Sequence, residues 1–156
     1  MFFIEYIALQ NYMGVYRKAY ELLMDRKFHP WEGGEGKVTA QYTRTMVELA
    51  KEAMRAEKWN EAEQILEKAL VYPENLGEGK LEGSKDNHIN YYLALTERAL
   101  GNEKKALTLF EAASTGTDEP AGMMFYNDQP ADMILYQGLS LKEIGQDIKA
   151  NSRFYK

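Results

Sequence analysis

The feature that most constrains the fold is an alanine that recurs at a nearly constant interval along the 156 residues. In four segments a short loop is followed by an alanine and then by apolar residues, and these alanines are Ala19, Ala62, Ala106 and Ala150. Successive alanines are 43, 44 and 44 residues apart. A fixed period of this length is typical of repeat architectures, in which one supersecondary unit stacks on the next.

The residues around each alanine have the spacing of an amphipathic helix. Ala62, Leu66 and Ala69, for example, recur at intervals of three or four residues. A second amphipathic stretch, rich in strong helix formers, precedes each loop. The repeating unit is therefore predicted to be helix, tight turn, helix, without β-strands. The predicted helices span 2–12, 15–27, 40–56, 59–72, 87–100, 103–114, 131–144 and 147–155.

This pattern resembles the tetratricopeptide repeat, in which a small residue on the first helix and an alanine on the second allow a close crossing. The small residue falls on Ala50, Ala94 and Gly138, but on the bulky Ile7 in the first unit. The turn glycine of the pattern is replaced by Glu57 in the second unit. The resemblance implies an all-α fold: a right-handed α-solenoid of antiparallel helix pairs with long loops between the repeats.

The chain is expected to form one helical-repeat domain over residues 1–156, with units of about 1–30, 39–73, 87–118 and 131–156. The period exceeds the family's usual repeat of about 34 residues, and the extra length lies in the loops between units. The loops that begin at Phe28 and Tyr72, and the segment from Tyr126, also resemble the repeat region of large bacterial proteins that carry an amino-terminal domain of unknown function. This second resemblance implies no activity, but it implies that the chain is part of a longer array.

The first two long loops are copies of each other in sequence. Gly34-Glu35-Gly36-Lys37-Val38 matches Gly77-Glu78-Gly79-Lys80-Leu81. Apolar residues such as Trp31, Leu76 and Leu81 favour ordered, packed loops, and each lysine is predicted to pair with the glutamate two residues before it. The loop residues that are candidates for ligand contact are Trp31, Glu32, Lys37, Glu78, Lys80, Asn127 and Asp128. Alternatively, the loops only brace neighbouring units.

Composition and motifs argue against several classes of function. The absence of cysteine excludes disulfides, thiolate metal sites and cysteine nucleophiles. The net charge of −5 disfavours a general nucleic-acid or anionic-membrane role. The glycine-rich segment 33–37 lacks the spacing of a phosphate-binding loop, and the two histidines lie in different units. We therefore expect no catalytic residue, no metal and no cofactor, and we expect that the protein is not an enzyme.

Repeat arrays bind ligands along a groove lined by the first helices. The usual groove positions fall on Arg44, Lys51, Arg55, His88, Tyr91, Arg98 and Lys142. Cations gathered there favour an acidic ligand, because arginine can hold a carboxylate through two parallel hydrogen bonds. In the alternative interpretation, Arg44, Lys51 and Arg55 only solvate a helix face and pair with Glu48 and Glu52.

The sequence thus favours a non-enzymatic scaffold that binds a protein or peptide through a concave, locally basic groove, without nucleic-acid or membrane partners. The alternative is an accessory region of a carbohydrate-active protein, with Trp31, Glu32, Glu78 and Asn127-Asp128 contributing to glycan binding. The cysteine-free composition and the absence of a signal-peptide pattern favour a cytoplasmic location. Both terminal helices lack polar outer faces, so either the chain is a piece of a longer array or its uncapped ends meet other subunits in self-association.

Overall fold

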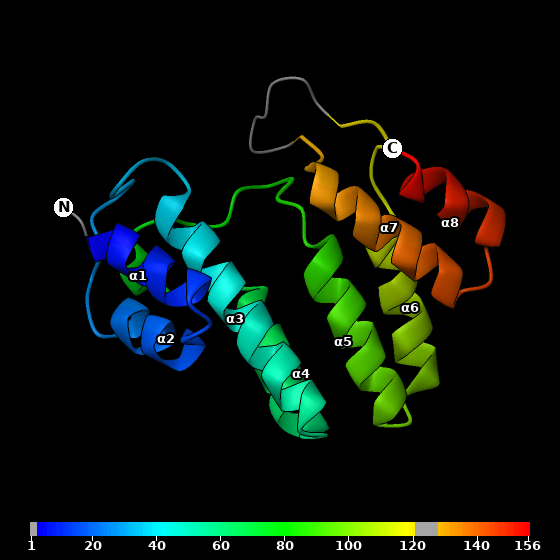
Figure 1. The fold of residues 1–156 in the computed structure, drawn as a ribbon, viewed down its shortest axis with the longest axis horizontal. Helices are drawn as coiled ribbons and strands as arrows, with labels where there is room; N and C mark the ends of the chain where they lie inside the picture. Colours follow the sequence, from blue (N-terminus) through cyan, green and yellow to red (C-terminus); the bar gives the residue numbers. More distant parts are fainter. Residues whose placement is uncertain (1–2, 121–127) are drawn as a thin grey trace. The chain divides into compact units, whose positions relative to one another are not determined.

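The computed structural model describes residues 3–120 and 128–156 (Figure 1). The helices are α1 (Phe3–Tyr12), α2 (Tyr16–Met24), α3 (Lys37–Arg55), α4 (Trp59–Ala69), the short 3-10 helix η1 (Glu74–Leu76), α5 (Asn87–Ala99), α6 (Glu103–Ala113), α7 (Ala131–Glu143) and α8 (Asp147–Phe154). All eight predicted helices are present, each end within three residues of its predicted position, and the described residues contain no β-strand. The all-α prediction is therefore confirmed for this part of the chain.

The chain divides into two compact units, Met1–Lys80 and Leu81–Lys156. The first contains the helix pairs α1–α2 and α3–α4, and the second contains α5–α6 and α7–α8. Each pair corresponds to one predicted repeat. The prediction of one domain over residues 1–156 stays a prediction.

In the first unit, α3 packs against α1, α2 and α4. The repeat alanines Ala19 and Ala62 are fully buried. The turn between α1 and α2 passes through Gly14 with φ of +76°, and the turn between α3 and α4 passes through Glu57 with φ of +58°. A left-handed conformation costs glycine little but strains a residue with a Cβ, so Glu57 occupies a position better suited to glycine.

In the second unit, α7 packs against α5, α6 and α8, and α5 packs against α6. The repeat alanines Ala106 and Ala150 are buried. A Cβ placed on Gly138 of α7 would lie 2.5 Å from Cε1 of Phe154 in α8. This close approach confirms that a small residue is required here for the two helices to pack.

In the first unit, the segment after α4 holds the loop after α2. The backbone N–H of Phe28 donates to the carbonyl of Asn75 over 2.7 Å. The side-chain Nδ2 of Asn75 donates to the carbonyls of Leu23 at 2.8 Å and Arg26 at 2.9 Å. These bonds satisfy carbonyls at the end of α2 that lack partners within the helix. Leu76 is fully buried beside them, as predicted for a packed loop residue.

The two loops that match in sequence have different structures. Lys37 is the first residue of α3, whereas Lys80 lies outside any helix and its Nζ donates to the Leu70 carbonyl over 2.9 Å. The prediction that Glu78 pairs with Lys80 is wrong. Both oxygens of the Glu78 carboxylate accept from the backbone N–H of Gly36, at 3.0 and 3.2 Å, because a carboxylate is favourable at the start of α3.

Two loop residues that were predicted to be packed are exposed. Trp31 is 66% exposed and has φ of +58°, and Leu81 is 46% exposed. Trp31 lies in a tight turn in which the N–H of Gly34 donates to its carbonyl over 2.8 Å. Phe28, which is 2% exposed, and the fully buried Leu76 provide the apolar packing of these loops instead. The packing prediction is therefore wrong for Trp31 and Leu81.

Candidate binding surface

The most distinctive surface in the second unit is a set of neighbouring rings that we call the aromatic cluster. It consists of His88, Tyr91 and Tyr92 on α5 and Tyr136 on α7, and all four are half-buried. The ring centroids are 5.3 Å apart for Tyr91–Tyr92, 5.7 Å for Tyr91–Tyr136 and Tyr92–Tyr136, and 5.9 Å for His88–Tyr136. These separations favour edge-on and tilted ring contacts, so the cluster is preorganised while part of each residue stays accessible.

Tyr92 and Tyr136 are repeat partners, 44 residues apart. Their hydroxyl groups lie 3.2 Å from each other and form a hydrogen bond. The groove positions transferred from the family pattern include Tyr91 but neither of these tyrosines. The signal that could have found them was the repeat spacing itself, which places both rings at the same position of neighbouring first helices.

Arg98, a predicted groove residue, already has two carboxylate partners. Its Nε and Nη2 donate to the two carboxylate oxygens of Glu103 at 3.1 and 3.2 Å, and its Nη1 donates to Glu143 at 2.5 Å. The guanidinium also lies over the Phe110 ring, 4.6 Å from the centroid. The hydrogen bond to Glu103, followed by that to Glu143, raises the pKa of Arg98. An acidic ligand would therefore have to compete with Glu103 and Glu143 for the Arg98 guanidinium.

Tyr91 joins the aromatic cluster to the core. Its ring centroid lies 6.0 Å from that of the fully buried Phe110. Burial raises the pKa of the Tyr91 phenol, and the charge of Glu143 raises it further, while Arg98 opposes the change. The phenol therefore stays protonated at neutral pH and keeps its capacity to donate a hydrogen bond.

Two exposed residues of α7 lie within six positions of Tyr136 in the sequence. Leu135, the neighbour of Tyr136, is 47% exposed, and Lys142 is exposed one residue before the Arg98 partner Glu143. Lys142 forms no ion pair within the described chain. Of the predicted groove residues in this unit, His88, Tyr91 and Arg98 belong to one contiguous network that reaches α7 through Tyr136 and Glu143.

In the first unit, the predicted groove residues lie on α3. Arg44 and Arg55 are exposed and form no ion pair among the described residues. Lys51 Nζ lies 2.7 Å from the carboxylate of Glu48, one helical turn away. The alternative in which α3 cations pair along their own helix is thus correct for Lys51. Of the predicted groove cations on α3, Arg44 and Arg55 are left to attract an acidic ligand.

In the first unit, the loop candidates Glu32, Glu78 and Lys80 each have a different partner. Glu32 is held by Arg26, whose Nη2 lies 2.8 Å from its carboxylate and whose guanidinium lies over the Phe28 ring. Lys37 is exposed at the start of α3, and Asp128 is half-buried in the second unit. Asn127 lies outside the described residues. Trp31 is therefore the loop candidate with the most accessible apolar surface.

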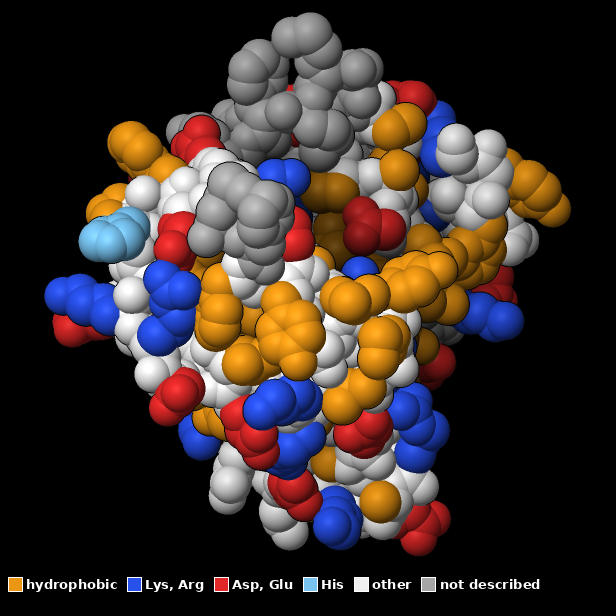
Figure 2. Space-filling view, turned by 60° about the vertical axis from the view of Figure 1, so that its left-hand side comes forward, with side chains coloured by type: hydrophobic (Ala, Val, Ile, Leu, Met, Phe, Trp, Pro, Cys, Tyr) orange, Lys and Arg blue, Asp and Glu red, His pale blue; other side chains and the backbone are white. Residues whose placement is uncertain are grey.

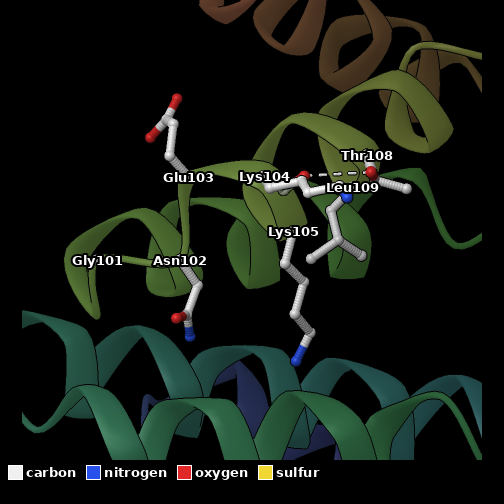
Figure 3. A pocket seen from close by; sticks show the side chains of 7 residues that line it. All are labelled: Gly101, Asn102, Glu103, Lys104, Lys105, Thr108 and Leu109. Atoms are coloured by element: carbon white, nitrogen blue, oxygen red, sulfur yellow. Dashed lines mark hydrogen bonds between the residues drawn. The ribbon is translucent and has the colours of Figure 1, made fainter.

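A shallow depression at the turn between α5 and α6 is lined by Gly101, Asn102, Glu103, Lys104, Lys105, Thr108 and Leu109 (Figure 3). The side chains of Asn102 and Lys105 project to one side and that of Glu103 to the other (Figure 3). Asn102 Nδ2 donates to the fully buried Glu97 over 2.8 Å, and Lys105 forms an ion pair with the same carboxylate. These groups serve the packing of the turn, so the aromatic cluster is the stronger candidate for ligand binding.

Compared with known proteins, the chain matches no family model and no solved structure. The likeness to tetratricopeptide repeats therefore remains a resemblance carried by the residues quoted above. Across the parts of the chain that the structure describes, every helix falls short of the length or the apolar character needed to cross a bilayer.

Proposed function

We propose that this chain is a non-enzymatic binding module built from tetratricopeptide-like helix pairs in a right-handed solenoid. The observation that carries the proposal is the aromatic cluster, because it joins rings of two successive first helices at matched repeat positions. In a repeat array these helices line the concave binding face. Half-buried rings offer contact area at little cost in side-chain entropy, as binding surfaces require.

The ligand that best suits this surface is a peptide segment with aromatic or aliphatic side chains and nearby carboxylates. The tyrosine rings would contact the apolar groups, and the exposed Lys142 would attract an acidic group. The attraction to acidic ligands is weaker than the sequence predicted, since Arg98 and Lys51 already have carboxylate partners. The binding energy is therefore expected to come mainly from aromatic contact rather than from charge.

The proposal is tested by screening a peptide library that varies acidic and aromatic residues against the immobilised protein. Tyr136→Ala is expected to weaken the best peptide by about 30-fold, the effect of removing a hot-spot ring. Tyr136→Phe, which keeps the ring, is expected to lose much less. Lys149→Ala removes an exposed cation from α8 and serves as the control. Unchanged peptide binding by folded Tyr136→Ala would refute the role of the cluster.

Glycan binding is the second candidate, and the exposed Trp31 favours it. A tryptophan ring that is 66% exposed can stack on the apolar face of a sugar. Its left-handed backbone is the kind of local strain that often accompanies function. On a glycan array, loss of binding in Trp31→Ala but not in Tyr136→Ala would favour this candidate. Binding by neither the wild type nor the variants would exclude it for the glycans displayed.

A further inference from the structure

Tyr92 and Tyr136 contact each other through their hydroxyl groups as well as through their rings. The two hydroxyl oxygens are 3.2 Å apart, and either one can donate the hydrogen bond. The ring centroids are 5.7 Å apart, with an angle of 66° between the ring planes. In a phenol the ortho carbons are bonded to the carbon that carries the hydroxyl group, so a contact between hydroxyl groups brings ortho carbons of the two rings near each other. These are the atoms that join when two tyrosines are oxidised to dityrosine.

Other tyrosine pairs have the ring contact without the hydroxyl contact. The ring centroid of Tyr91 lies 5.3 Å from that of Tyr92 and 5.7 Å from that of Tyr136, but its hydroxyl group forms no hydrogen bond within the described part of the chain. In the first unit, the centroids of Tyr42 and Tyr72 are 6.3 Å apart. The Tyr42 hydroxyl donates instead to a backbone carbonyl of α4 over 3.1 Å. The hydroxyl contact therefore distinguishes Tyr92 and Tyr136 from these pairs.

The two rings are also accessible and held in place. Tyr92 and Tyr136 are half-buried, so part of each residue stays in contact with solvent. Side chains of the hydrophobic class, in which tyrosine is counted, reach the surface on the face drawn in Figure 2. Because α5 packs against α7, the rings stay together, and a reaction between them is favoured over a reaction between separate molecules.

We propose that Tyr92 and Tyr136 form a site of oxidative cross-linking, at which a one-electron oxidant joins α5 covalently to α7. Each phenol gives one electron to the oxidant and one proton to water, which leaves a phenoxyl radical on each ring. A carbon–carbon bond then forms between one ortho carbon of each ring, and the hydrogens of these carbons move to the two oxygens. The reaction consumes two equivalents of a one-electron oxidant, such as a peroxide-derived radical, and removes two hydrogen atoms from the chain. This inference does not depend on the binding function proposed for the aromatic cluster.

The cross-link joins two successive first helices at residues that are 44 positions apart. A covalent bond between residues distant in the sequence restricts the unfolded chain and raises stability, as a disulfide does. The chain contains no cysteine, so it has no thiol that could form such a bond. Oxidation of the tyrosine pair is therefore expected to stabilise the second unit.

The experiment exposes the full chain, in dilute solution, to a photo-excited ruthenium complex with persulfate. Protease digests are then analysed by mass spectrometry. The expected product is a pair of peptides joined through Tyr92 and Tyr136, with two hydrogen atoms fewer than the separate peptides and with the fluorescence of dityrosine. The cross-linked chain is expected to remain a monomer in mass and to unfold at a higher urea concentration. Methionine also reacts with oxidants, so the readout is the linked peptide rather than the total change in mass.

The variants keep each ring and remove one phenol at a time. Tyr92→Phe and Tyr136→Phe are each expected to lose the linked peptide, and either one answers the question if circular dichroism shows that the other fails to fold. Tyr91→Phe is the matched control, because it leaves the hydroxyl contact intact, and it is expected to retain the linked peptide. The wild type unfolded in urea is expected to give at least about tenfold less of it, because the effective concentration of the two rings falls when the fold is lost.

Three results would overturn the proposal. The first is a folded wild type that gives no linked peptide while Tyr12 and Tyr155, which are 81% and 90% exposed, are oxidised. The second is a linkage that runs through Tyr91 in place of Tyr92 or Tyr136. The third is an equal yield of the linked peptide from the folded and the unfolded chain, because the fold would then not direct the coupling.

Discussion

In both units an asparagine side chain caps carbonyls at the end of a second helix, but the asparagine comes from a different segment in each unit. In the first unit, Asn75 comes from the loop after α4 and caps the carbonyls of Leu23 and Arg26 behind α2. In the second, Asn87 comes from the start of α5 and donates to the carbonyls of Ala113 and Thr115 behind α6, both at 2.8 Å. The two asparagines are not repeat partners, so the requirement for a cap recurs while its source does not.

The surroundings of the two caps differ as well. Asn75 is half-buried beside the fully buried Leu76, an apolar anchor. Asn87 is buried in an amide network: Gln129 Nε2 donates to its Oδ1 at 3.1 Å, while Gln137 Nε2 donates to the Thr117 carbonyl at 2.9 Å. An apolar anchor tolerates a swap of similar volume, but a buried polar network must be satisfied group by group. The two units should therefore respond differently to substitution.

The largest effect is expected from removing the apolar anchor of the first unit. Leu76→Ala leaves a cavity at a fully buried site and should lower the free energy of unfolding by about 2–5 kcal/mol. Leu76→Met keeps most of the volume and should cost less than about 1.5 kcal/mol. Urea denaturation followed by circular dichroism measures both. Equal losses in the two variants would show that Leu76 is not a packing anchor.

The second largest loss of stability is expected from removing the two asparagine caps. Asn87→Ala removes the partner of the buried Ala113 carbonyl, of the partly buried Thr115 carbonyl and of the Gln129 amide, and should cost about 2–3 kcal/mol. Asn75→Ala should cost about 1–2 kcal/mol, because water can reach the half-buried cap and replace part of its bonding. The same denaturation assay ranks them, and hydrogen exchange at the ends of α2 and α6 locates the effect. A larger loss in Asn75→Ala than in Asn87→Ala would contradict the proposed difference between the buried and the half-buried cap.

Alkaline pH probes a further helix-end bond in the first unit. The Tyr42 hydroxyl donates to the Lys68 carbonyl near the end of α4 over 3.1 Å, and burial raises the pKa of Tyr42 to about 12, with a smaller effect from Tyr20. Since the folded-state pKa of Tyr42 lies above the ordinary tyrosine value of 10.0, the stabilisation is complete below pH 10 and is lost as the pH rises toward 12. The slope should not exceed about 1.4 kcal/mol per pH unit.

Tyr42→Phe is the matched variant for that measurement, because it removes the titrating group and keeps the ring. Its unfolding free energy, measured by urea denaturation at each pH, should lose the part of the slope that Tyr42 contributes. Tyr91 in the second unit also has a raised pKa, so some slope should remain. An unchanged slope in Tyr42→Phe would assign the alkaline response to other groups.

The smallest effect concerns the turns within the helix pairs. Glu57→Gly relieves a left-handed backbone at a non-glycine residue and should stabilise the first unit by about 0.5–1 kcal/mol. The reverse change in the second unit, Gly101→Ala, meets no neighbouring atom within 4 Å and has φ of +87°, so it should destabilise by about 1 kcal/mol through the backbone alone. Thermal melts compare the pair. Changes of the same sign would contradict this account.

Much of the fold was predictable because its signals are local. The 3.6-residue spacing of apolar positions and the recurring alanine predicted eight helices in four pairs, and the structure contains them. Part of the candidate surface was predictable too: His88, Tyr91 and Arg98 are groove positions that the structure joins into one network. Tyr92 and Tyr136 are absent from the predicted groove positions because the family pattern, rather than the repeat spacing, selected those positions.

The sequence by itself determined the helix pairs, their period and the small residues at their crossings, since each follows from a pattern within a few turns of helix. Only the tertiary structure decided that Glu78 caps α3, that Asn75 caps α2 and that Arg98 holds Glu143. These partners lie 42 to 52 residues apart and share no local pattern. A buried N–H or carbonyl takes whichever polar group the packed chain brings near, so its partner depends on the fold as a whole.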